Sequence, residues 1–262
     1  MTTTIDTHEL DDKVQEMYRL VAEQPRGRYH FEMGRPVATR LGYPDEYLDA
    51  VPQASIESFA GVGYFFDLAA LQPGERVIDL GSGSGTDTFV AAHLVGPTGR
   101  VVGIDFTPEQ HEKATRLADE AGLGDVVEFW ERRIEHLPSG DGEFDCVISN
   151  GVVNLSADKP QVFREASRVL RPGGRLVLAD IVSEQHLTDA IVGNTDLWAS
   201  CIGGAAQEDD YRALIESAGL ELREVRRNDY AFVSGQAQGA SATYGVKSVS
   251  IVAVKPGDAP DN

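Results

Sequence analysis

The hydrophobic positions of the chain follow two different patterns, and the change falls near residue 71. Between residues 10 and 23 the apolar side chains recur at helical spacing, and a Pro- and Gly-containing break follows them. Two shorter segments, residues 44–50 and 51–59, also suit helices. From residue 76 onward short apolar runs alternate with amphipathic windows. We therefore expect an N-terminal helical lid over residues 1–70 and a main domain over residues 71–262.

The main domain shows the alternation that is typical of α/β proteins. Predicted strands occupy residues 76–80, 100–105, 126–130, 144–149 and 175–180, with helices at 85–95, 108–121 and 159–170 between them. Short apolar strands separated by helices predict βαβ units and a parallel sheet that is covered on both faces. An irregular insertion at about residues 183–207 interrupts the pattern. A helix at 208–218 follows, and strand-like runs at 221–228 and 247–255 predict an antiparallel hairpin at the sheet edge.

The composition excludes several classes of protein. The 262 residues include 42 acidic and 23 basic side chains, for a net charge of −19. Phosphate-binding surfaces are built from Lys and Arg, so we expect no nucleic-acid partner. No apolar run reaches the ~18 residues of a membrane span, and the first residues lack the basic and apolar regions of a signal peptide. We expect a cytoplasmic protein without membrane contact, and the sequence gives no indication of its oligomeric state.

Cysteine and histidine offer no metal site. The two cysteines stand 55 residues apart, which provides neither a disulfide framework nor a Cys-rich zinc site. The histidines of the main domain fall on separate predicted elements with no paired spacing. The sequence therefore predicts no bound metal.

A glycine-rich turn joins the first predicted strand to the first helix of the main domain. Residues 79–85 read Asp-Leu-Gly-Ser-Gly-Ser-Gly, and such glycines let a ligand approach the backbone at a helix N-terminus. Asp105 ends the next strand, where a carboxylate can accept hydrogen bonds from both hydroxyls of a ribose. Because the carboxyl ends of parallel strands meet at one edge of a sheet, both features should face the same crevice.

Two details decide which cofactor this crevice suits. Thr86 stands where a dinucleotide fingerprint requires its third glycine. Asp79 would repel a pyrophosphate, but it suits a ligand that carries an ammonium group. S-adenosylmethionine has an ammonium, a carboxylate, a sulfonium and a ribose, and it has no phosphate. We therefore expect S-adenosylmethionine rather than NAD.

These motifs resemble those of class I S-adenosylmethionine-dependent methyltransferases, within the subgroup of arsenite and ubiquinone/menaquinone methyltransferases. The resemblance runs from about residue 51 to residue 220 and rests on residues 77–87, 103–110, 148–155, 169–174 and 197–204. It implies an α/β fold with a Rossmann-like, doubly wound, seven-stranded sheet, mostly parallel with an antiparallel edge hairpin. We expect the N-terminal helical segment to serve as the lid of the acceptor pocket.

The resemblance further implies roles for individual residues. Around the methionine part of the cofactor it places Asp79, Gly81, Ser82, Gly83 and Gly85. Asp105 would hold the ribose, with Phe106 near the adenine, and Ile134 and Glu135 in the loop at the adenine edge. Asn150 would lie beside the methyl donor, and the loop at residues 61–63 would cover the cofactor and approach the acceptor.

The sequence departs from the arsenite-type pattern at the acceptor. Enzymes of that type hold trivalent arsenic between cysteine thiolates, which suit a soft, thiophilic centre. Cys201 matches one of the three positions, but Val62 and Gly151 occupy the other two. Cys146 lies in mid-strand, where a free cysteine packs as a small hydrophobic residue. We therefore expect a small organic acceptor rather than arsenite, in a roomier apolar pocket.

A hydroxyl or amine acceptor would need a general base. Tyr29 and His30 are the candidates, with Asp67 behind them, and Cys201 is either an acceptor-pocket residue or an ancestral remnant. Trp198 and Tyr244 suit the pocket wall and the core equally well. Two alternatives stay open: a non-catalytic S-adenosylmethionine-binding sensor or partner subunit, and an NAD(P)-dependent oxidoreductase.

Overall fold

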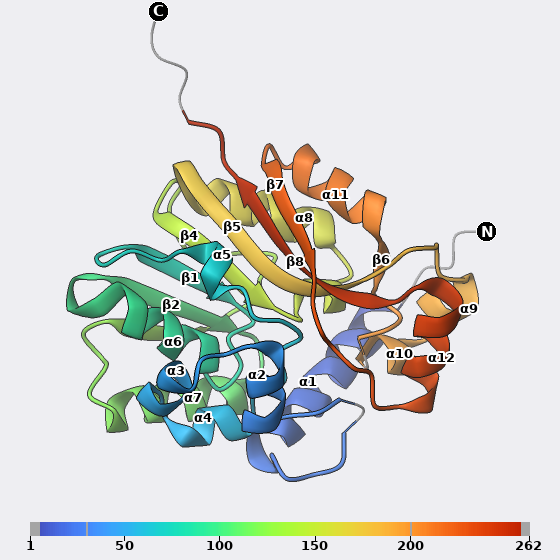
Figure 1. Ribbon diagram of the computed structural model, residues 1–262, viewed down its shortest axis with the longest axis horizontal. Helices are drawn as coiled ribbons and strands as arrows, with labels where there is room; N and C mark the ends of the chain where they lie inside the picture. The colour runs from blue at the N-terminus through green and yellow to red at the C-terminus, as the bar shows by residue number, and fades with distance from the viewer. Residues whose placement is uncertain (1–5, 30, 200, 258–262) are drawn as a thin grey trace, which may run out of the picture.

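A single twisted sheet with helices on both faces forms the centre of the protein (Figure 1). The computed structural model describes residues 6–29, 31–199 and 201–257. The strands are β1 (Arg76–Leu80), β2 (Arg100–Asp105), β3 (Val127–Glu131), β4 (Phe144–Asn150), β5 (Leu170–Ser183), β6 (Ala206–Gln207), β7 (Glu221–Arg227) and β8 (Lys247–Val254). Their order is β3-β2-β1-β4-β5-β8-β7, with β6 paired to β5 outside this path.

The strand pairing confirms the predicted Rossmann-like sheet. Strands β1 to β5 pair in parallel, and β8 runs antiparallel to both β5 and β7, which makes the expected edge hairpin. The predicted number of seven strands omits the two-residue β6, so the sheet has eight. Strand β5 is also longer at both ends than predicted. At its start Leu170 pairs with Phe144 of β4, and at its end Val182 pairs with β8 and Ser183 with β6.

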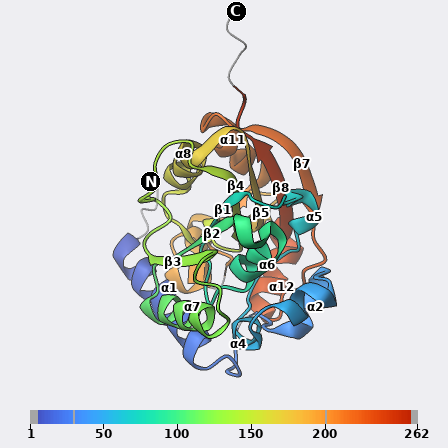
Figure 2. The ribbon, with the colours of Figure 1, turned by 90° about the vertical axis from the view of Figure 1, so that its left-hand side faces the viewer.

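Alternating side chains of the parallel strands build two separate apolar cores. Val77, Val101 and Ile148 point to the face that is covered by α6 (Thr86–Val95) and α7 (Pro108–Glu120). The residues next to them in the chain point to the other face, against α8 (Lys159–Val169) and α11 (Glu208–Ser217). Figures 1 and 2 show these helix pairs on opposite sides of the sheet. Because both faces are buried, the strands are continuous apolar runs, which is why the sequence pattern located them.

The N-terminal segment packs onto the main domain. It contains α1 (Thr7–Glu23), α2 (Arg35–Leu41), α3 (Asp45–Ala50), α4 (Gln53–Glu57) and α5 (Phe66–Ala69), and the pattern had not indicated α2 and α5. Asp6 caps α1 by accepting hydrogen bonds from the backbone N–H groups of His8 and Glu9. Helix α1 lies along α7, where Gln110 donates to the carbonyl of Tyr18. The buried side chains of this segment belong to the same core as β1 and α6. The division at residue 70 stays a prediction.

The insertion and the last connection also contain helices. Residues 183–207 include α9 (Asp189–Val192) and α10 (Thr195–Ala199), and α10 packs against α1, where Lys13 Nζ donates to Thr195 Oγ1 at 2.8 Å. The Gly- and Ser-rich stretch before β8, expected only to connect the hairpin, forms α12 (Gly235–Tyr244). Ser234 caps it and two of its alanines are buried, so tertiary packing outweighs poor helix propensity. Short 3₁₀ turns, Gly96–Thr98 and Val153–Leu155, complete the described elements, among which no helix could cross a membrane.

Candidate functional site

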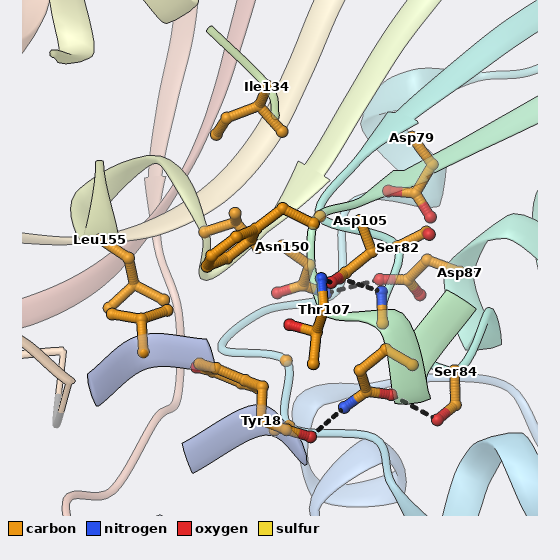
Figure 3. A pocket seen from close by; sticks show the side chains of 18 of the residues that line it. Tyr18, Asp79, Ser82, Ser84, Asp87, Asp105, Thr107, Ile134, Asn150 and Leu155 are labelled. Atoms are coloured by element: carbon orange, nitrogen blue, oxygen red, sulfur yellow. Dashed lines mark hydrogen bonds between the residues drawn. The ribbon is translucent and has the colours of Figure 1, made fainter. Parts of the chain in front are cut away.

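A cavity opens at the carboxyl ends of β1, β2 and β4, where the strand order reverses. It encloses about 1010 Å³ of space including its open mouth. Its walls come from the β1–α6 turn, the ends of β2 and β4, residues 133–135 and helix α1 (Figure 3). Open α/β sheets bind ligands at this point. Nine of the ten predicted cofactor-binding residues line it: Asp79, Gly81, Ser82, Gly83, Asp105, Phe106, Ile134, Glu135 and Asn150.

Three glycines with positive φ shape the turn after β1. Gly83 has φ +53° and lines the cavity, whereas a Cβ at Gly81 (φ +74°) would lie 2.4 Å from the side chain of Val152. A Cβ at Gly85 would lie 2.8 Å from the rings of Phe89 and Phe129. Gly85 is the one predicted cofactor residue outside the described lining. It therefore serves the packing of α6 against β3.

Asp105 is held in place by the backbone around it. Its two carboxylate oxygens accept the N–H groups of Gly83 and Thr107, each at 2.9 Å. Burial raises the pKa of Asp105, and these two hydrogen bonds oppose that shift. Since each carboxylate oxygen has a second lone pair, both can still accept a hydroxyl of a ribose.

Two acids, Asp79 and Asp87, lie beside the glycine turn (Figure 3). Asp79 is 1% exposed and accepts a hydrogen bond from the Thr88 hydroxyl at 2.7 Å. Burial, followed by the charge of Asp87, raises the pKa of Asp79 well above its usual range. Burial also raises the pKa of Asp87 to about 6, against the lowering effect of hydrogen bonds from Tyr43 and Asn150. This end of the cavity is built to receive a cation.

The predicted adenine end is organised by Arg133. Its guanidinium donates to both carboxylate oxygens of Asp11 in α1, at 2.8 and 3.0 Å, and lies 5.4 Å from the centroid of the Phe106 ring. It also pairs with Glu135 at 3.4 Å. Glu135 accepts the Ser156 hydroxyl at 2.5 Å. The loop predicted to border the adenine is thus tied to α1 on one side and to the loop after β4 on the other.

Asn150 links this site to the loop at residues 61–63. Its Oδ1 accepts the N–H of Val62 at 2.7 Å, and its Nδ2 donates to Asp87 at 2.9 Å. Val62 and Gly151 face each other, since a Cβ at Gly151 would lie 3.2 Å from Val62 Cγ1. The structure therefore brings together two of the positions at which the arsenite-type pattern has cysteines.

One further observation supports the fit of the lining to S-adenosylmethionine. Among the residues that the structure describes, the Ser82 hydroxyl is buried in the cavity wall without a hydrogen-bond partner. Buried hydroxyls are almost always paired, so a polar ligand is expected here. The carboxylates of Asp79 and Asp87 suit its ammonium group and Asp105 suits its ribose. The residues present thus match each end of the cofactor.

Comparison with known proteins decides the family. Residues 71–219 match the family described as "Methyltransferase domain". The arsenite methyltransferase of Halobacterium salinarum is 42% identical over 194 residues, which cover 72% of this chain and 48% of that protein. The chain belongs to the class I S-adenosylmethionine-dependent methyltransferases. The chain spans about half the length of the arsenite methyltransferases that it matches.

Other relatives of this methyltransferase-family chain agree with that assignment. The ubiquinone/menaquinone C-methyltransferase of Hahella chejuensis is 38% identical over 118 residues, which cover 45% of this chain and 47% of that protein. The crystal structure of an arsenic(III) S-adenosylmethionine methyltransferase from Chlamydomonas reinhardtii is 30% identical, with a TM-score of 0.62, covering 86% of this chain and 74% of that one. S-adenosylmethionine, expected from the sequence, is the cofactor of this family.

The two described residues that were predicted to act on the acceptor, Tyr29 and Cys201, do not line the cavity. The Tyr29 hydroxyl lies 2.8 Å from the carbonyls of Leu20 and Gln24, at the end of α1. Asp67 forms an ion pair with Arg226, so its carboxylate does not support Tyr29 as a base. His30 lies outside the described residues. Neither Tyr29 nor Cys201 is among the described residues that line the cavity.

The cysteines are both buried. The Cys201 thiol lies 4.0 Å from the Tyr18 hydroxyl, and burial raises its pKa to about 12. Burial raises the pKa of Cys146, within β4, to about 12 as well. Trp198 packs under Lys159 Nζ, 4.4 Å from the ring centroid. Tyr244, at the end of α12, packs half-buried against the core.

Sequence reasoning missed Tyr43, Asp87 and Arg133 as parts of the site. Asp87 had a signal, since it ends the glycine-rich motif two residues after Gly85. Arg133 stood next to the predicted adenine loop. Tyr43 had none, because its partner Asp87 lies 44 residues further along the chain.

Proposed function

We propose that this protein transfers the methyl group of S-adenosylmethionine to a small organic acceptor that carries no phosphate. The observation that supports it most directly is the cavity at the β1–β2–β4 edge, with Asp79 and Asp87 at one end and Asp105 at the other. When bound, the cofactor supplies a methyl group on a sulfonium, which leaves as a neutral thioether. In-line transfer then needs little more from the protein than correct placement of the acceptor.

The chain's own residues would provide that placement. The Asp79–Asp87 pair binds the ammonium end, and Asp105 accepts the ribose hydroxyls. Arg133 keeps α1 against the adenine loop through Asp11. Helix α1 also forms part of the wall, and we infer that residues 1–70 serve as the lid that excludes water from the reaction.

Charge argues against a phosphorylated acceptor. Among the described residues that line the cavity, Arg133 carries the only basic side chain, and it already pairs with Asp11 and Glu135. A phosphate needs one or more cationic or N–H donors. Part of the wall is apolar and comes from Val14, Tyr18, Phe59, Val152 and Leu155. A neutral, partly apolar molecule fits this wall.

Thiol chemistry argues against arsenite. Where the arsenite-type pattern has a pair of cysteines, Val62 packs against Gly151. Cys201 is the one matching thiol, and its raised pKa keeps it protonated at neutral pH. Metal and metalloid ligation requires the thiolate. A single protonated thiol does not replace a cage of thiolates, which supports an acceptor other than arsenite.

Binding and product analysis test this proposal. We expect calorimetry to show binding of S-adenosylmethionine and S-adenosylhomocysteine but not of NADH or NADPH. Incubation with methyl-labelled S-adenosylmethionine should label acceptors from a panel of neutral phenols, amines and thiols. Arsenite with glutathione, and phosphorylated analogues of the same acceptors, should stay unlabelled.

Each other outcome contradicts a stated part of the proposal. Nicotinamide-nucleotide binding would indicate an oxidoreductase. Cofactor binding without transfer to any acceptor would indicate a sensor or partner subunit. Labelled methylarsenicals would show that one thiol is sufficient for arsenite, and labelled phosphorylated acceptors would contradict the charge argument.

A further inference from the structure

Tyr43 is an N-terminal residue whose hydroxyl is buried beside the cofactor site. It follows α2, directly after Gly42, which ends that helix with φ +102°. Its ring is 3% exposed and packs edge-on against Phe59 and Tyr64, with centroids 5.1 Å apart in each pair, and against Phe66 at 6.1 Å. A buried phenol needs a hydrogen-bond partner for its hydroxyl. Here that partner is a carboxylate.

The hydroxyl of Tyr43 donates to Asp87 Oδ1 at 2.6 Å. Asn150 Nδ2 donates to the other oxygen, Asp87 Oδ2, at 2.9 Å. Hydrogen bonds to both oxygens favour the ionised form of a carboxylate, whereas burial favours the protonated form. The two donors thus act against burial, which raises the pKa of Asp87.

Asp79 makes the ionisation of Asp87 matter for the ligand. Two acids this close do not both ionise readily at neutral pH, because like charges in a buried site repel. Asp79 accepts one side-chain donor, the Thr88 hydroxyl. Asp87 accepts two, the Tyr43 hydroxyl and the Asn150 amide, one on each oxygen. Asp87 therefore carries the negative charge of the pair before a cation arrives.

No other charged contact of Asp87 competes with Tyr43 within the described residues. Asp105 of β2 acts on Asp79, one strand away. Helix α3 also packs against α6, but its acids Asp45 and Asp49 are paired with Arg35 at the surface. Two further acids on these elements, Glu46 of α3 and Glu131 of β3, are exposed. Tyr47 of α3 lies against His93 near the far end of α6, and Glu128 of β3 pairs with Arg100.

We propose that Tyr43 is a positioning residue of the cofactor site: with Asn150 it holds Asp87 as the carboxylate that receives the ammonium group of S-adenosylmethionine. This inference rests on the proposed function. The N-terminal segment then contributes to cofactor affinity through a hydrogen bond to an acid, without touching the cofactor itself. Affinity for ligands that carry the ammonium group depends on pH, because protonation of Asp87 removes the charge that attracts it.

The direction in which affinity changes with pH follows from the ionisation of Asp79 and Asp87. Below the pKa of Asp87 the pair is neutral, so the affinity for an ammonium ligand falls as the pH falls, by up to about tenfold per unit. Loss of the Tyr43 hydroxyl raises the pKa of Asp87 further. The pH profile then moves to higher pH by about one to two pH units, the order of one hydrogen bond to a charged group. At pH 7 the affinity therefore falls by about two- to tenfold, because a smaller fraction of Asp87 is ionised.

The test compares two ligands from pH 5.5 to 7.5 by calorimetry. S-adenosylhomocysteine carries the ammonium group, whereas 5′-methylthioadenosine has the same adenine, ribose and thioether sulfur without it. In Tyr43→Phe the aromatic packing is kept and only the hydroxyl is lost. We expect weaker S-adenosylhomocysteine binding with a shifted profile and unchanged methylthioadenosine binding. Asp87→Asn should make the S-adenosylhomocysteine profile flat.

Tyr64→Phe is the matched control, because Tyr64 packs against Tyr43 in the same aromatic cluster and makes no described contact with Asp87. It should leave both ligands and the profile unchanged. The inference is overturned if Tyr43→Phe keeps the wild-type pH profile, or if it weakens both ligands equally, which would indicate a purely structural role. If the wild type binds neither ligand, the proposed function itself fails, so the two failures are distinct.

Discussion

Replacing Asp105 with alanine tests the ribose assignment. In the structure its carboxylate oxygens each accept one backbone N–H, from Gly83 and Thr107. Each oxygen also keeps a second lone pair, and Asp105 lines the cavity. The change therefore has two separable effects, one on the empty protein and one on the ligand.

The magnitudes follow from the contacts. Each N–H that loses its acceptor costs about 1–3 kcal/mol when buried, and solvent entering the cavity reduces this, so we expect a loss of about 2 kcal/mol in stability. For a protein of this size that lowers the Tm by about 4–8 °C. Loss of the hydrogen bonds from the ribose to a charged acceptor costs about 1.5–3 kcal/mol, which weakens ligand binding about 10- to 150-fold.

The assay is calorimetry with S-adenosylhomocysteine and with 5′-methylthioadenosine, together with thermal unfolding. Because both ligands carry the ribose, Asp105→Ala should weaken both by the same factor, unlike Tyr43→Phe. Asp119→Ala is the control, since Asp119 is an exposed acid near the end of α7 and its loss changes the net charge equally. A lowered Tm with unchanged affinity for both ligands would refute the assignment, because the ribose would then lie elsewhere.

Three further predictions concern the acceptor side and the fold. Cys201→Ser should leave methyl transfer within about threefold of the wild type, since the raised pKa keeps this thiol protonated; loss of labelled product would show that sulfur takes part. Val62→Cys with Gly151→Cys should create binding of phenylarsine oxide, measured by calorimetry against the wild type, at a stability cost of about 1–2 kcal/mol because Gly151 has φ +75°. Glu75→Gln should lower the free energy of unfolding in urea by about 2 kcal/mol, because Glu75 accepts both terminal guanidinium nitrogens of the half-buried Arg175, at 2.8 and 2.7 Å, while cofactor affinity stays unchanged.

The parallel strands were predictable because burial on both faces leaves a simple signal. Strands β1 and β2 have the predicted bounds, since runs such as Val77-Ile78 leave no polar position to confuse the pattern. Helix α12, in contrast, had no clear signal in the local sequence. Its residues are mostly Gly, Ser, Gln and Ala, and only its contacts with the core through Ala237 and Ala240 make it helical. Local sequence does not contain that information.

That the predicted cofactor residues gather around one cavity was predictable for a related reason. A turn that needs positive φ at Gly81 and Gly83, and an acid at the end of the next strand, are local requirements that leave a fixed spacing. Acceptor residues have no such spacing. Tyr29 is adjacent to a histidine in the sequence, which made it a candidate base, but its hydroxyl lies against the last turn of α1.

The contrast between local requirements and long-range contacts also explains why the predicted cofactor site extends beyond residues 71–219. Residues 71–219, which match the methyltransferase domain, contain the glycines of the turn together with Asp79, Asp87 and Asp105. The donor that opposes burial of Asp87, however, comes from Tyr43, and the amide that completes its hydrogen bonds also binds the backbone of the loop at Val62. A hydrogen bond between residues 44 positions apart constrains neither local spacing nor periodicity, so no motif reveals it. If Tyr43 sets the charge of Asp87, then the segment that covers the acceptor also determines how tightly the methyl donor binds, and cofactor affinity and lid placement change together.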